Sequence, residues 1–82
     1  MARVVVERQF SPALTMSDIA AMERESHWCM DTYRIKRLES FFANDGEHLI
    51  CVYEAPDVES VRRANETAGL PYTRIWAAEE LP

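Results

Sequence analysis

The residues best suited to chemistry in this chain are its two histidines, because each stands near carboxylates. Glu23, His27 and Asp31 lie four residues apart, so a continuous helix places them along one flank. Imidazole nitrogen and carboxylate oxygen together form a sound donor set for nickel or zinc. The same spacing also occurs on solvated helix flanks, where a glutamate and a histidine merely make a favourable contact. Glu23, His27 and Asp31 are the first candidate metal ligands.

A second candidate metal ligand is His48, which directly follows Glu47 and lies close to Asp45. At the tip of a hairpin, a histidine and two carboxylates could bind a metal ion in a partly solvated site. The alternative is a polar residue beside an exposed turn. The sequence is also compatible with an approach of His27 to His48, within one chain or between two chains.

No motif in the chain demands catalysis. Cys29 and Cys51 are 22 residues apart without a CxxC spacing, which is typical of neither a disulfide framework nor a zinc ribbon. Both fall at positions expected to face the core, where a free cysteine packs as a small hydrophobe. The two glycines occupy predicted turns, so there is no P-loop and no GxGxxG motif, and we expect no nucleotide cofactor.

The elements that must position these side chains follow from hydrophobic periodicity. The pattern predicts four strands and two helices, over residues 3–10, 15–30, 33–43, 48–54, 58–68 and 72–78. The first helix can be capped by Thr15 or Ser17, and the second begins after Asp57 and ends at Gly69. Imperfect alternation in the second strand predicts a β-bulge near Arg37-Leu38.

The resulting order β, α, β, β, α, β predicts a ferredoxin-like α+β fold: a four-stranded antiparallel sheet, ordered 4-1-3-2, with two helices on one face. The 82 residues are expected to form one domain over 1–82. The other sheet face stays open, and a second subunit commonly covers it, so we expect a homodimer. Alternatively, this face lines the cleft of a small-molecule binder or cofactor-free enzyme of the dimeric α+β barrel type. Glu7 would be its polar anchor, beside Trp76 or Ile75.

Composition narrows the range of partners. The net charge of −5 and the pI near 4.9 disfavour nucleic acid and anionic membrane surfaces, which need clustered Lys and Arg. No apolar stretch is long enough for a signal peptide or a membrane span. We therefore expect a cytoplasmic protein without nucleic-acid or membrane partners.

Two segments of the chain resemble a known family. Residues 5–10 are similar to a VERxF opening, and residues 51–65 are similar to a CxYEAPDxESVRRAN segment that ends in Gly69-Leu70-Pro71. The chain thus resembles a family of small bacterial proteins catalogued as a domain of unknown function, which includes a nickel-binding, nickel-responsive protein. The resemblance implies a ferredoxin-like fold, a dimer, and binding of nickel or another divalent transition metal for storage, buffering or response.

Overall fold

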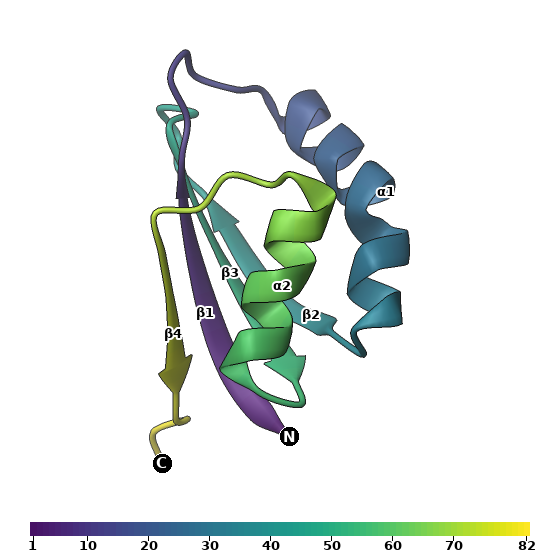
Figure 1. The fold of residues 1–82 in the computed structure, drawn as a ribbon. Coiled ribbons are helices and arrows are strands. Elements are labelled where there is room, and N and C mark those ends of the chain that lie inside the picture. The colour runs from purple at the N-terminus through teal and green to yellow at the C-terminus, as the bar shows by residue number, and fades with distance from the viewer.

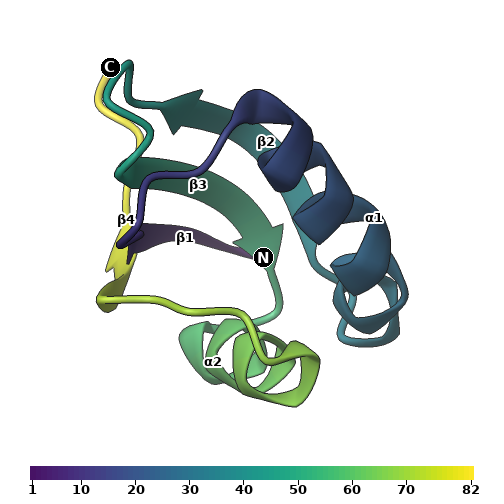
Figure 2. The same cartoon turned by 90° about the horizontal axis from the view of Figure 1, so that it is seen from above.

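Four strands and two helices make up the protein in a computed structural model that describes residues 1–82 (Figure 1). In chain order they are β1 (Ala2–Gln9), α1 (Met16–Thr32), β2 (Lys36–Phe42), β3 (His48–Ala55), α2 (Val58–Ala68) and β4 (Arg74–Ala78). All strand pairs are antiparallel, in the order β2-β3-β1-β4. Both helices lie on one side of the sheet (Figure 2). The predicted ferredoxin-like architecture and strand order are confirmed.

Helix α1 begins with a capping box. The Thr15 hydroxyl accepts a hydrogen bond from the Asp18 backbone N–H, and the Asp18 carboxylate accepts one from the Thr15 N–H at 2.8 Å. The bond from the Thr15 N–H, together with one that the Thr15 hydroxyl donates to the same carboxylate, lowers the pKa of Asp18, because both favour its charged form. Of the two predicted caps, Thr15 is the one used. Neither this helix nor α2 has the length and apolar character needed to span a bilayer.

The connection from α1 to β2 differs from the prediction. Helix α1 continues to Thr32 instead of ending near Met30, and Arg34 adopts a left-handed backbone conformation with φ of 60°. The Arg34 and Ile35 N–H groups donate to carbonyls of the last helical turn, which closes the turn. The predicted start of the second strand at residue 33 is therefore wrong, and β2 begins at Lys36. Likewise, β4 begins at Arg74 rather than at residue 72.

The predicted bulge is present in β2. Arg37 pairs with Tyr53, whereas Glu39 pairs with Val52, so one extra residue is inserted between them. The shift turns the side chains beyond the bulge to the opposite face from the one that uninterrupted alternation gives. Phe41 consequently lies on the open face of the sheet, where its side chain is 62 % exposed.

The core lies between the sheet and the helices. Alternate residues of β1 and β3 point toward the helices, including Val4, Val6 and Cys51, which are at most 3 % exposed. Helix α2 contributes Val61 and Ala64, and α1 contributes Ile19, Cys29 and Met30. Both cysteines are free and buried, as expected.

The two glycines allow a matched test of the turns. Both have positive φ, but a Cβ at Gly46 would lie 2.5 Å from the Leu14 carbonyl oxygen, whereas a Cβ at Gly69 would meet no atom within 4 Å. Gly69→Ala is expected to lower the free energy of unfolding by about 1 kcal/mol, the left-handed backbone cost alone. Gly46→Ala should lower it by about 2–4 kcal/mol, because the clash adds to that cost. Urea denaturation measures both, and equal losses would contradict the importance of the Gly46–Leu14 contact.

Candidate functional site

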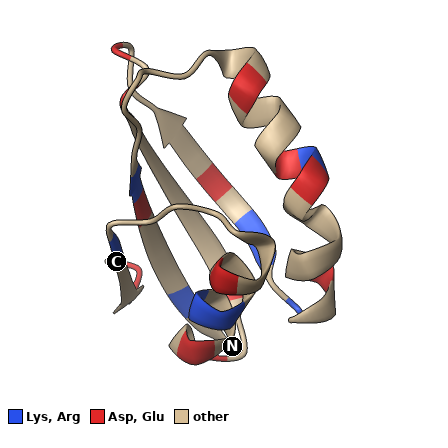
Figure 3. Cartoon of the chain, turned by 45° about the horizontal axis from the view of Figure 1, so that its top comes forward, with Lys and Arg blue, Asp and Glu red and all other residues tan.

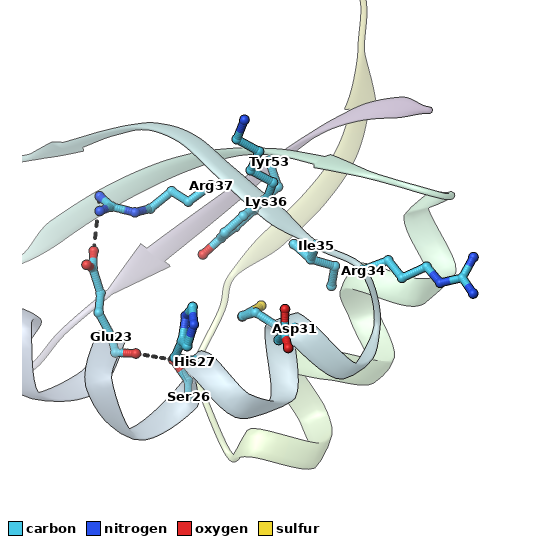
Figure 4. Close-up of a pocket in the computed structure, with 10 residues that line it drawn as sticks. Glu23, Ser26, His27, Asp31, Arg34, Ile35, Lys36, Arg37 and Tyr53 are labelled. Carbon is cyan, nitrogen blue, oxygen red and sulfur yellow. Dashed lines mark hydrogen bonds and ion pairs between the residues drawn. The ribbon is translucent and has the colours of Figure 1, made fainter.

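A cleft of about 580 Å³ lies between the C-terminal half of α1 and the start of β2. Figure 4 shows the side chains that line it. They come from one flank of α1, from the α1–β2 turn, from the first residues of β2 and from the middle of β3: Glu23, Ser26, His27, Met30, Asp31, Arg34, Ile35, Lys36, Arg37 and Tyr53. The volume lies within the range of about 300–1,000 Å³ typical of small-ligand pockets.

The helical period explains why α1 contributes one continuous wall. Its lining residues recur at spacings of three and four, which places them on the flank that faces β2. Ser26 is buried, and its hydroxyl donates to the Met22 carbonyl oxygen at 2.7 Å. Figure 3 shows acidic residues along α1 and basic residues at the start of β2. The two walls of the cleft therefore carry opposite charges.

All three predicted ligands of α1 line this cleft, but one of them is engaged. The Glu23 carboxylate forms an ion pair with Arg37, Oε1 to Nη1, at 3.1 Å. His27 and Asp31 point into the space between the helix and the sheet (Figure 4). No three histidine, cysteine, aspartate or glutamate side chains gather closely enough to hold a metal ion. The donor types suit nickel, while the number of donors brought together within one chain falls short of a complete site.

His48 lies elsewhere, at the first position of β3. Its Nδ1 is 3.5 Å from Asp45 Oδ2, and both side chains are about half exposed. Asp45 also accepts a hydrogen bond from the Glu47 backbone N–H at 2.8 Å, which stabilises the hairpin turn. His48 does not line the cleft that contains His27. The structure thus contains two separate histidine–carboxylate groups.

The open face of the sheet brings Glu7 and Trp76 together. The Trp76 indole Nε1–H donates to Glu7 Oε2 at 2.7 Å, and Arg74 Nη1 lies 3.7 Å from the same oxygen. Ile75 points to the helix side, because it pairs with Val6 of the core. Of the two residues considered for this face, Trp76 is therefore the one present.

Sequence reasoning did not identify Arg8, which is only 3 % exposed on the helix-facing side of β1. Its Nη1–H donates to the Pro71 carbonyl oxygen at 2.8 Å, and its Nη2–H donates to the Tyr53 hydroxyl at 3.3 Å. Burial raises the pKa of Tyr53 to about 12; the neighbouring Cys51 thiol adds to the rise and the Arg8 guanidinium opposes it. The sequence did contain a signal for the burial of Arg8, because strand alternation places it on the same face as Val6.

The chain is similar to one described protein family and to solved structures. A family model described as "Nickel responsive protein SCO4226-like" matches residues 5–77. One similar solved structure is the crystal structure of SCO4226 from Streptomyces coelicolor A3(2), with a TM-score of 0.86 and 15 % sequence identity. That similarity covers 99 % of this chain and 100 % of the other, and at this identity it shows the fold alone. No curated protein sequence matches the chain.

The raised pKa of Tyr53 predicts a loss of stability at high pH. The folded-state value of about 12 lies above the ordinary value of 10.0, so folding favours the neutral phenol. The stabilisation is complete below about pH 10 and is lost as the pH rises toward about 12; about 1 kcal/mol should be lost by pH 11. Urea denaturation at about pH 9 and about pH 11 should show a larger fall for the wild type than for Tyr53→Phe. Equal falls would contradict a buried, neutral Tyr53.

Proposed function

The chain belongs to the SCO4226-like family of nickel-responsive proteins, and from this premise we propose that it binds Ni²⁺ or a similar divalent transition ion. The family match over residues 5–77 is the observation that carries the proposal. It also confirms the resemblance read from the two sequence segments. Metal storage, buffering or response is the function that this membership favours.

His27 and Asp31 are the donors of α1 best placed for this role. They are one helical turn apart, they line the cleft, and Asp31 takes part in none of the ion pairs of the protein. Glu23 would have to leave Arg37 before it could coordinate an ion. Two protein donors leave coordination positions for water or for side chains of a second copy.

His48 and Asp45 form the other two-donor group. Their atoms are already 3.5 Å apart, and their exposure of 57 % and 49 % leaves the pair accessible to an ion from solvent. The imidazole nitrogen and the carboxylate oxygen can both coordinate one metal ion placed between them. We assign it as the second, weaker location because the surrounding turn offers solvent instead of further side-chain donors.

Calorimetric titration of chelator-treated protein with Ni²⁺, and separately with Zn²⁺, tests the metal proposal. Wild type is expected to bind Ni²⁺ with micromolar or tighter affinity. The double variant His27→Ala, His48→Ala should lose at least about ten-fold in affinity, equivalent to about 1.4 kcal/mol. The single variants His27→Ala and His48→Ala show how much of the Ni²⁺ affinity each location contributes. Glu25→Gln is the matched control, because it removes a charge from exposed α1 surface outside the cleft.

Two results would count against the proposal at different levels. Tight binding that survives in the double variant would overturn the ligand assignment and retain metal binding. Binding of both ions weaker than millimolar in the wild type would overturn metal binding itself.

A second proposal concerns the open sheet face, which we expect another copy of the chain to cover. Phe41, Ile50 and Trp76 are 62 %, 41 % and 41 % exposed there, on three different strands. A two-fold axis parallel to the strands would set β2 of one copy against β4 of the other. The strand register would then set Phe41 of one copy level with Arg74 of the other, where a guanidinium can pack on an aromatic ring. Such a pairing would enclose Glu7 and Trp76, and a small-molecule cleft between the two sheets is the alternative use of this surface.

Light scattering after size-exclusion chromatography tests the pairing of two copies. Wild type should have a mass of about twice 9.5 kDa. Phe41→Glu should shift the protein to the monomer, because it would bury a charge in the interface. Trp28→Glu is the control, since Trp28 is a similarly exposed aromatic residue, 60 % exposed, on α1. A monomeric wild type at all concentrations would contradict the proposal.

A further inference from the structure

Helix α1 carries three candidate metal donors in one row but leaves only two of them outside an ion pair. Glu23, His27 and Asp31 are spaced four residues apart, and all three line the cleft. Two side chains one helical turn apart can coordinate the same ion, so His27 can share an ion with either carboxylate. Glu23 and Asp31 lie about 12 Å apart along the helix axis, so the two pairs would hold an ion at different places.

Arg37 distinguishes these two places. Its Nη1 lies 3.1 Å from Glu23 Oε1, whereas Asp31 makes no ion pair. An ion that coordinates Glu23 must displace the guanidinium or lie beside it, where the two positive charges repel each other. A metal ion and Arg37 therefore compete for the same carboxylate.

Arg37 is the one cation of β2 and the preceding turn that reaches this row. It pairs with the buried Tyr53 on the helix side of the sheet, and strand alternation turns its neighbour Lys36 to the open face. Arg34 points away from the cleft (Figure 4). The competition for Glu23 thus depends on a single side chain, which can be changed without altering the donors.

The ion pair is exposed enough to open, since the Glu23 and Arg37 side chains are 41 % and 48 % exposed and such pairs are weak. We propose that Arg37 sets the metal affinity of α1: it holds Glu23 in the metal-free protein and keeps binding weak enough for the ion to be released. The inference rests on the proposed metal binding and adds the residue that regulates it. By linkage, metal binding through Glu23 and the Glu23–Arg37 pair weaken each other.

Calorimetric titration of chelator-treated protein with Ni²⁺ tests the inference, with His48→Ala as the parent so that only the α1 location remains. Arg37→Gln should raise the Ni²⁺ affinity of this parent about five-fold, equivalent to about 1 kcal/mol, the upper range for an exposed ion pair. Arg37→Lys retains the cation and should stay within about two-fold of the parent. Arg62→Gln is the matched control, because it removes the same charge and an exposed ion pair with Glu59, at 2.9 Å, on α2.

Glu23→Gln shows whether Arg37 acts through this carboxylate. In protein that already carries Glu23→Gln, Arg37→Gln should change the affinity less than about two-fold, because no carboxylate is left to release. A gain in affinity is an informative readout, since damage to the fold would lower the affinity instead.

Three outcomes would overturn the inference. An unchanged or lower affinity in Arg37→Gln would show that Arg37 does not oppose the ion, and an equal gain with and without Glu23 would show that it acts by another route. Ni²⁺ binding by the wild type that is absent from the His48→Ala parent would place the ion away from α1 and leave metal binding itself intact. Only a wild type that fails to bind Ni²⁺ would remove the proposed function together with this inference.

Discussion

Both candidate surfaces depend on the central position of β1, which is hydrogen-bonded to β3 on one side and to β4 on the other. Successive side chains of β1 point to opposite faces of the sheet: Val4 is buried under the helices, and Glu7 faces the open side. The same strand sets the register of both neighbours, placing Tyr53 opposite Val4 and Trp76 opposite Val5. The cleft floor and the open face are thus two faces of one set of strand pairings.

The bulge in β2 determines what the cleft can do. By inserting one residue between Arg37 and Glu39, it leaves Arg37 on the helix side opposite Tyr53 and sends Glu39 to the open face. Arg37 then reaches the flank of α1 and pairs with Glu23. That pair removes a carboxylate from the group of histidine and acids on the helix, and it retains a cation in the wall. A single backbone irregularity therefore leaves His27 and Asp31 as the two helix donors of the cleft outside any ion pair.

Most of the fold could be predicted because its signals are local. Asp57 and Gly69 mark the ends of α2 through caps that depend on single residues, and the bulge was visible as a break in alternation. The start of β2 could not, since the turn before it uses Arg34 in a conformation for which arginine carries no signature. Helical spacing correctly gathered the three candidate ligands on one flank. It could not reveal the pairing of one ligand with Arg37 or the burial of Arg8, because both contacts join segments that are distant in the sequence.

The Glu23–Arg37 pair is the cross-connection between α1 and the edge strand at the cleft, and its two side chains are 41 % and 48 % exposed. Exposed pairs contribute only about 0–1 kcal/mol, and their attraction falls as the screening length shortens from about 8 Å at physiological salt to about 3 Å at 1 M. Dissolved salt therefore weakens the ion pair that joins the two walls and leaves the apolar contacts of the floor unchanged. We expect the distance between the two walls of the cleft to depend on ionic strength through this one ion pair.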